Sequence, residues 1–380
     1  MTSLAPKGDF IGVEDRVHLA AGGETPFLKS HLEAFTRYAL DKSAGLPGRV
    51  RQLAIHDRAR GRAATLLGVQ KDEVAFLPST SDGVNMVAQT IDFKPGDNVV
   101  VETIEFPSDV YPWLLQRDKG VEVRFVGDGF EVPPGALEAA IDVRTRVVAL
   151  SQVSYLTGAR HDLRPIADAA HAVGATFIVD ASHALGVVPV DARVADFVFS
   201  CCYKWQLGTT GIAVGFWNRQ LQPDWAPRVA GWMSAKPAGG EGETRRHGFA
   251  PRDDAMRMTL GNPSLSGAYV VDNGLKYLLD VGIENIEAHV LELTARLREG
   301  LVELGLVVLT PAEPSRRAGN ICIARTDGPR YIELLAERGV LAWEADGRVR
   351  YSAHLYNDSS DIDRAIEASR HAVATLGTGS

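Results

Sequence analysis

Lys204 stands in a sequence setting that suits covalent chemistry. It follows an apolar run that ends at Ser200, within the string Cys201-Cys202-Tyr203-Lys204-Trp205. A lysine just beyond a buried strand and between aromatic side chains is expected to lose part of its hydration, which favours the neutral amine. The neutral amine is the form that adds to a carbonyl to give a Schiff base. The alternative is a structural lysine whose stem packs at the strand end while its ammonium reaches water.

Two further polar features also follow apolar runs. Asp180 ends one such run, and the triplet Ser79-Thr80-Ser81 separates the run Val74–Leu77 from a helical stretch. The carboxyl ends of parallel strands meet at one crevice, so Asp180 and Lys204 are expected to face the same pocket. Hydroxyls and N–H groups at a helix start favour an anion, although such a triplet is also an ordinary helix cap. A lysine, a carboxylate and a phosphate cradle are together what pyridoxal phosphate requires.

Short apolar runs alternate with helical patterns between about residues 60 and 220, and these elements must position the three features. The runs lack polar alternation, which is typical of strands covered on both faces and predicts an α/β fold with a mostly parallel seven-stranded sheet. The predicted strands are Val74–Leu77, Asn98–Val101, Val121–Val126, Arg146–Leu150, Thr176–Val179, Phe197–Ser200 and Ile212–Trp217. Amphipathic stretches between them are Gly83–Ile91, Gly135–Ile141 and Arg164–Val173.

The pattern changes after Trp217 and predicts a second domain. Ser234–Gly248 has no periodic apolar face and is expected to be an exposed loop, whereas helical spacing predicts two linking helices at Ser264–Leu279 and Glu284–Leu304. We expect an N-terminal arm (1–17), a large domain (18–262), linking helices (263–304) and a small α+β domain (305–380) near which the arm packs. The expected elements of the small domain are runs at Val307–Leu309, Asn320–Ala324 and Arg348–Ser352, and helices at Arg330–Arg338 and Ser360–Leu376.

Composition narrows the class of protein. The chain has a net charge of −8, with 45% hydrophobic and 23% charged residues, which is ordinary for a folded globular chain. No basic run offers a footprint for nucleic acid, and no apolar run has the length of a membrane helix or the character of a signal peptide. Three cysteines, two of them adjacent, make neither a disulfide framework nor a zinc pattern. We therefore expect a cytoplasmic enzyme that binds neither nucleic acid, membrane nor metal.

From about His18 to its C-terminus the chain resembles the aminotransferase class V branch of the fold-type I pyridoxal-phosphate enzymes, which includes cysteine desulfurases, kynureninases and isopenicillin N epimerase-like proteins. The resemblance implies that Lys204 forms the Schiff base and that Asp180 pairs with the pyridine nitrogen. It places His183 near the phenolic oxygen or the phosphate of the cofactor. It also implies that Ser79-Thr80-Ser81 and Tyr203 contact the phosphate.

Several segments are closest to the kynureninase-like subgroup. Phe106, in a string that runs through Asp109, occupies the position that stacks on the cofactor ring, where desulfurases have a histidine. Asp109 and Tyr155 also match that subgroup, which implies that Asp109 contacts the cofactor and Tyr155 the substrate. Trp232 and Asn262 resemble residues that complete the site of a neighbouring subunit, which implies a homodimer with shared active sites. From the residues alone, Trp232 is a core residue and Asn262 a turn residue.

The string Arg348-Val349-Arg350-Tyr351-Ser352 resembles the family strand whose arginine binds the substrate α-carboxylate. Arg350 aligns with that arginine, and its planar guanidinium suits a bidentate carboxylate pair. Arg348 is expected to be a surface charge. The implied substrate is an L-α-amino acid.

The cysteines depart from the desulfurase pattern. The stretch 340–347, where a desulfurase carries its nucleophile, has no cysteine. Cys322 lies in an apolar run and is expected to be core, and Cys201 is expected to pack near the cofactor. We therefore expect that the chain is not a persulfide-forming cysteine desulfurase.

The resemblance implies a mechanism whose last step stays open. The substrate amine displaces Lys204 to form an external aldimine, Arg350 holds the carboxylate, and Lys204 removes the Cα proton to leave a carbanion. Phe106 in place of histidine favours cleavage of a Cβ–S or Cβ–C bond. The alternatives are an aminotransferase, an epimerase, or a catalytically silent protein of the same fold. A nucleotide-binding dehydrogenase is disfavoured because no Gly-x-Gly-x-x-Gly turn follows Leu77 or Val101.

Overall fold

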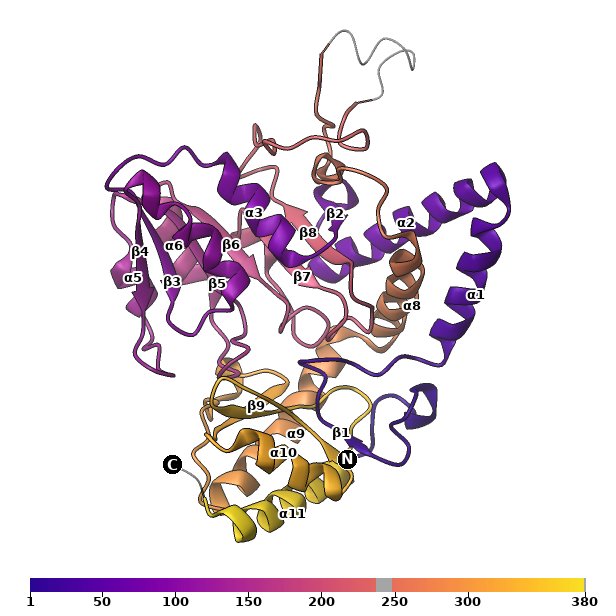
Figure 1. Cartoon of the computed structure of the whole chain (residues 1–380), viewed down its shortest axis with the longest axis vertical. Coiled ribbons are helices and arrows are strands. Elements are labelled where there is room, and N and C mark those ends of the chain that lie inside the picture. Colours follow the sequence, from indigo (N-terminus) through magenta and orange to yellow (C-terminus); the bar gives the residue numbers. More distant parts are fainter. Residues whose placement is uncertain (237–247, 379–380) are drawn as a thin grey trace.

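The computed structural model describes residues 1–236 and 248–378, and within them the large domain is built on a seven-stranded sheet (Figure 1). The strand order is β2-β8-β7-β6-β5-β3-β4, and only β8 runs antiparallel to its neighbours. The seven predicted strands are confirmed, each to within one residue at either end. Their bounds are β2 Val74–Leu77, β3 Asn98–Glu102, β4 Glu122–Val126, β5 Thr145–Ser151, β6 Thr176–Asp180, β7 Phe197–Cys201 and β8 Ala213–Trp217.

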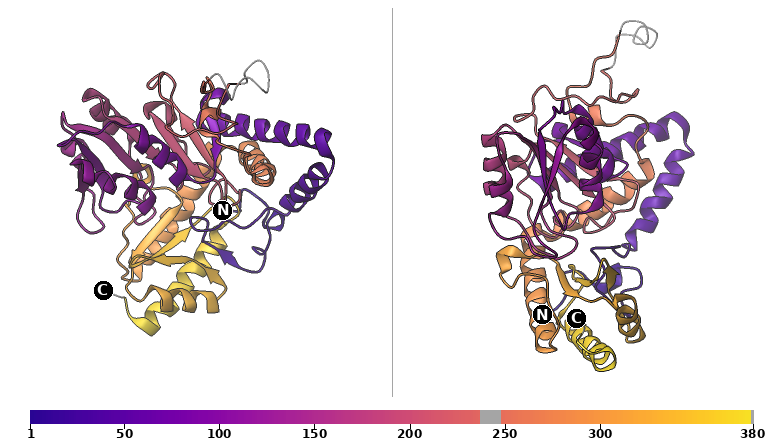
Figure 2. Two further views of the ribbon diagram at one scale, coloured as in Figure 1. Left: turned by 45° about the horizontal axis from the view of Figure 1, so that its top comes forward. Right: turned by 60° about the vertical axis from the view of Figure 1, so that its left-hand side comes forward.

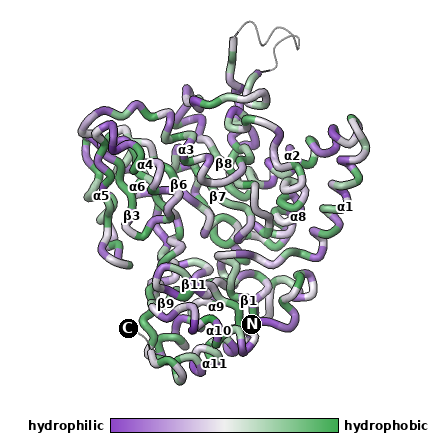
Figure 3. Tube along the Cα trace, in the orientation of Figure 1, coloured by the Kyte–Doolittle hydropathy of each residue, from purple (hydrophilic) through white to green (hydrophobic). Residues whose placement is uncertain are grey.

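Both faces of this sheet are buried, which explains the uninterrupted apolar runs. Successive side chains of a strand point to opposite faces, so Val100 and Val148 pack in one hydrophobic cluster while Val99 and Val147 pack in another. The sheet strands are accordingly largely hydrophobic in Figure 3. Helix α3 (Thr80–Thr90) covers one face with α4 (Tyr111–Leu114), and α5 (Ala136–Ala140) and α6 (Leu163–Ala172) cover the other.

Two N-terminal helices that the sequence pattern did not predict complete the large domain. Helices α1 (Ser30–Lys42) and α2 (Gly45–Leu67) form a hairpin that projects from the body of the molecule (Figure 1). Arg58 and Arg62 of α2 pair with the buried Asp272 of α8 (Leu265–Val281). Helix α9 (Ile283–Glu303) follows α8 and leads into the small domain, so the two predicted linking helices are present.

The small domain lies below the large one in Figure 1 and contains a three-stranded antiparallel sheet in the order β11-β12-β9. Its strands are β9 (Asn320–Ala324), β11 (Trp343–Ala345) and β12 (Arg348–Ser352), and its helices are α10 (Gly328–Glu337) and α11 (Ser359–Leu376). The run Val307–Leu309 does not form a regular strand: Val308 makes a single bridge to Ile323. Figure 2 shows α9, α10 and α11 on the side of this sheet away from the large domain.

The N-terminal segment packs on the small domain. Strand β1 (Val17–His18) pairs in parallel with β10 (Val340–Leu341), and Leu4 N donates to Leu355 O at 2.9 Å. Lys7 contacts Asp361 at the start of α11 at 2.7 Å. The expected exposed loop falls mostly at 237–247, outside the described residues. Among the helices that the structure describes, none is both long and apolar enough to cross a bilayer.

Candidate active site

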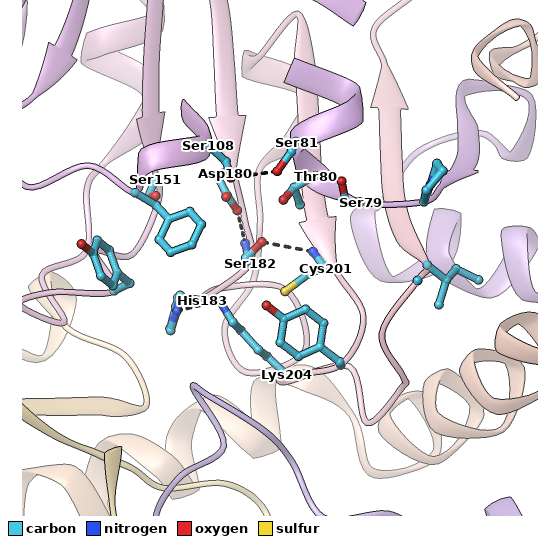
Figure 4. Close-up of a pocket in the computed structure, with 16 residues that line it drawn as sticks. Ser79, Thr80, Ser81, Ser108, Ser151, Asp180, Ser182, His183, Cys201 and Lys204 are labelled. Atoms are coloured by element: carbon cyan, nitrogen blue, oxygen red, sulfur yellow. Dashed lines mark hydrogen bonds between the residues drawn. The ribbon is translucent and has the colours of Figure 1, made fainter. Parts of the chain in front are cut away.

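A cavity of about 140 Å³ lies at the carboxyl ends of β6 and β7, next to the start of α3 (Figure 4). It brings together residues from the ends of several strands, as expected for an α/β sheet. Nine of the residues predicted from the sequence line it: Ser79, Thr80, Ser81, Phe106, Tyr155, Asp180, His183, Tyr203 and Lys204. The cavity also contains side chains that the sequence analysis did not assign to the site, namely Ser108, Ser151 and Ser182.

Lys204 is buried, and its amine lies inside the cavity. Its Nζ is 3.1 Å from Nε2 of His183 and 5.7 Å from the centre of the Phe106 ring. Burial, and then the positive charges of Lys204 and Arg350, hold the pKa of His183 well below its ordinary value, so the imidazole is neutral. Asn320 of β9 contacts Nδ1 of the same ring at 3.0 Å, which joins the small domain to the cavity wall.

Asp180 ends β6 and points into the cavity (Figure 4). Its Oδ1 accepts a hydrogen bond from Ser182 N at 2.6 Å. Asp109 is buried behind it and does not line the cavity. Burial, followed by the charges of Asp180 and Glu105, raises the pKa of Asp109 well above its ordinary value, so the neutral, protonated form of Asp109 is favoured. The carboxylate at the cavity thus has a neutral acid beside it rather than a second negative charge.

Glu105 supports the cavity from outside. Its carboxyl oxygens accept hydrogen bonds from Phe106 N at 2.7 Å and Ser151 N at 2.6 Å, which fixes the backbone that carries Phe106. Burial, and then the charge of Glu102, raises the pKa of Glu105 to about 8. Glu105 was not predicted as a site residue; its position three residues beyond the end of β3 was the available signal.

The start of α3 forms the other end of the cavity. Ser79 caps the helix by accepting a hydrogen bond from Asp82 N at 3.2 Å, and Ser81 Oγ donates to Ser108 Oγ at 2.8 Å. The first N–H groups of a helix have no partner within it, and the helix dipole favours negative charge there. A phosphate can be held at this end because hydroxyls and N–H groups face the same space as Thr80.

These features fit pyridoxal phosphate. A lysine amine, a carboxylate and a helix start lie around one cavity, so a single molecule can reach all three. Cys201 also lines the cavity, and burial raises the pKa of its thiol, so it is a neutral packing group beside the site.

Arg350 lies next to the cavity without lining it. It is 3% exposed, and its Nη1 donates to the carbonyl of Tyr155 at 2.9 Å. Burial, and then the charge of Arg348, lowers the pKa of Arg350 to about 9. The expectation that Arg348 is a surface charge is wrong, because its side chain is 1% exposed. Both arginines face the same side of β12, since residues two apart on a strand share a face.

Trp232 and Asn262 lie away from the cavity. Trp232 is 65% exposed, which excludes a core position, and Asn262 accepts a hydrogen bond from Arg49 of α2 at 2.6 Å. Neither residue touches the cavity of its own chain.

Comparisons with known proteins agree with the fold and with this cofactor. The aminotransferase class-V family model matches residues 48–365. The chain is 27% identical to a probable cysteine desulfurase of Methanothermobacter thermautotrophicus, over 92% of this chain and 93% of the relative. It is 28% identical to a kynureninase of Pseudomonas fluorescens, over 82% of this chain and 77% of the relative.

A solved structure of a cysteine desulfurase from Thermococcus onnurineus NA1 superimposes with a TM-score of 0.88 at 23% identity, covering 99% of this chain and 100% of that one. These similarities do not support the expectation that the chain is not a cysteine desulfurase. The chain belongs to the aminotransferase class-V family and is an enzyme that uses pyridoxal phosphate.

Proposed function

We propose that the enzyme acts on L-α-amino acids and breaks a Cβ–S or Cβ–C bond of its substrate. The observation that carries the site assignment is the single cavity shared by Lys204, Asp180 and the start of α3. Pyridoxal phosphate, when bound, supplies a ring that accepts the electron pair released at Cα of an amino acid. The similarity to a kynureninase and the apolar ring of Phe106 support the choice of bond.

Different residues around the cavity bind the cofactor and transfer protons. Lys204 would hold the cofactor aldehyde, and its amine would take the proton from Cα of the substrate. Asp180 would keep the ring nitrogen protonated, and the neutral Asp109 adds no second negative charge beside that carboxylate. The hydroxyls of Ser79, Thr80 and Ser81 hold the phosphate. His183 and Tyr203 complete the cofactor contacts.

Phe106 sets the plane of the cofactor ring, and two residues where the large and small domains meet bind the substrate. Arg350 pairs with the α-carboxylate through its planar guanidinium. Tyr155 forms the adjacent wall, since its ring meets that of Phe106 edge-on at 5.2 Å.

Borohydride reduction of the holoenzyme tests the assignment of Lys204. Reduction is expected to attach pyridoxal phosphate irreversibly to the peptide that contains Lys204, as read by mass spectrometry. Lys204→Ala is expected to abolish both the attachment and the activity, whereas Lys236→Ala, which removes an exposed lysine, serves as the control. Attachment to another lysine would overturn the assignment. Product analysis with a panel of L-amino acids then separates bond cleavage from transamination, which would instead convert the cofactor to its amine form.

We also propose that two copies form a homodimer in which Trp232 and Asn262 complete the partner's site. The exposed positions of both residues and the apolar side chains on the α1–α2 hairpin beside Asn262 support this. Leu40, Leu46 and Val50 are each more than half exposed on this hairpin. Sedimentation should show a dimer that Leu46→Glu weakens, whereas Val143→Glu, at an exposed apolar position on another surface, leaves it intact. A fully active wild-type monomer would contradict the proposal.

A further inference from the structure

The small-domain sheet presents two chemically different faces through β12. Val349 and Tyr351 point into the hydrophobic cluster formed with the helices of the small domain. Arg348, Arg350 and Ser352 alternate with them and therefore point the other way. That side faces the large domain, because Arg350 donates to Tyr155 and Ser352 contacts Asn320, which in turn contacts the cavity residue His183.

Arg348 is a buried cation without a partner on this face. Its Nε and Nη1 make no hydrogen bond, and Arg348 takes part in none of the salt bridges formed within residues 1–236 and 248–378. Its nearest aromatic neighbour is Tyr155, whose ring centre is 5.6 Å from the guanidinium carbon. Burial of an unpaired charge costs free energy. The folded protein is therefore stabilised by an anion that reaches Arg348 and pairs with it.

Arg348 and Arg350 together make a two-cation surface beside the substrate position. Two residues apart on a strand are separated by roughly 7 Å. The neighbouring Cys322, opposite Arg350 in the strand register, is uncharged because burial raises the pKa of its thiol. The α-carboxylate of an amino acid neutralises one of the two guanidinium groups and leaves the second available.

Tyr155 lines the cavity and also neighbours Arg348. Its ring lines the cavity on one side and meets Arg348 on the other, while its hydroxyl donates to Asp346 at the β11–β12 turn, at 3.1 Å. A side-chain rotation of Tyr155, which is a common response to ligand binding, would join Arg348 to the cavity.

We propose that Arg348 binds a second carboxylate, in the side chain of the substrate, and that the substrate is an acidic L-amino acid. This inference rests on the proposed function, in which Arg350 binds the α-carboxylate. Arg348 then determines specificity, since an amino acid with a neutral side chain leaves its guanidinium unpaired in the complex.

The test compares ligands with one and two carboxylates on the holoenzyme by titration calorimetry. Succinate is expected to bind on the order of ten- to a hundredfold more tightly than propionate, which corresponds to one charge-assisted contact. Arg348→Gln is expected to reduce that ratio to near one without weakening propionate, and Arg348→Lys to restore part of it. Arg338→Gln, which removes an exposed charge from the same domain, is the matched control and should change nothing.

Two results would overturn the inference. One is a wild-type enzyme that binds succinate no better than propionate. The other is an Arg348→Gln variant that folds, as judged by thermal unfolding, but binds succinate and propionate equally less tightly than the wild type. That result would mean that both arginines bind the same carboxylate or that Arg348 has a structural role. Failure of the proposed function is seen separately, as absence of the Lys204-linked cofactor after borohydride. The same comparison can be made with amino acids. L-aspartate is expected to change the cofactor spectrum at lower concentration than L-asparagine, whose side chain is neutral.

Discussion

The two halves of the site treat buried charge differently. At the large-domain half, the buried carboxyl groups of Asp180 and Glu105 accept backbone hydrogen bonds, and Asp109 is neutral. At the small-domain half, Arg348 and Arg350 keep buried donor groups without partners. Buried groups that already have hydrogen-bond partners hold one geometry, whereas unpaired ones are stabilised by a ligand that pairs with them. The first half is therefore arranged in advance for a resident cofactor, and the second is completed by each arriving substrate.

Asp180→Asn is expected to give the largest effect and to affect the first half alone. Loss of the negative charge at the ring nitrogen should reduce kcat roughly 10²–10³-fold, as for other groups that stabilise charge developing in a reaction. Asp109→Asn is the matched control, because that carboxyl is already neutral and an amide replaces it with little change in charge. Steady-state kinetics of both variants check this. An equal loss in the two would show that Asp109 is ionised.

Arg350→Gln is expected to affect the second half alone. Loss of one charge-assisted contact to a carboxylate should raise KM roughly ten- to a hundredfold. The cofactor spectrum in the absence of substrate should stay as in the wild type, because Arg350 does not line the cavity. A changed resting spectrum or a loss confined to kcat would mean that the two halves are not separable.

Glu105→Gln tests how much the stability of the large-domain half of the site depends on the proton that Glu105 carries. The pKa of Glu105 is raised to about 8 in the folded chain, so the folded state holds this proton more tightly than the unfolded one. The stabilisation from this proton is therefore fully present below about pH 4.5 and is lost as pH rises from about 4.5 to about 8. Denaturant unfolding should show the wild type losing roughly 3–4 kcal/mol relative to Glu105→Gln between pH 5 and 8. A constant difference would contradict the raised pKa.

Phe106→Leu is expected to give the smallest change. Loss of an aromatic stacking surface costs about 0.5–1.5 kcal/mol, which corresponds to a two- to tenfold weaker cofactor affinity. Phe125→Leu, an exposed position on β4, is the control. Cofactor titration of the apoenzyme checks the difference, and equal affinities of the Phe106 variant and the wild type would remove Phe106 from the cofactor contacts.

The same contrast explains which features could be predicted from the sequence. The strands of the large sheet are buried on both faces, so β2 and β7 appear as uninterrupted apolar runs, and Asp180 and Lys204 follow from the topology of parallel strands. Helix α2 was not predicted because small residues and arginines occupy much of it and only a minority of its residues are large and apolar.

Arg348 was misassigned for a different reason. A strand with alternating arginines and apolar residues normally has one face in water, and the covering of that face by a second domain is a long-range contact that local patterns do not contain. The signal that could have corrected the prediction was the two-residue spacing itself. If Arg350 faces the substrate, Arg348 on the same strand must face the same way.

The pairing of β1 with β10 has a consequence for the order in which the enzyme forms during synthesis. Val17 and its partner Val340 are more than 300 residues apart in the chain. At about 5–20 residues per second, the ribosome takes roughly 15–65 s to produce the second after the first. The large-domain sheet can form in that interval, whereas strand β1 has no partner until the C-terminal part of the chain emerges. The arginine half of the site is therefore the last part of the enzyme to be built.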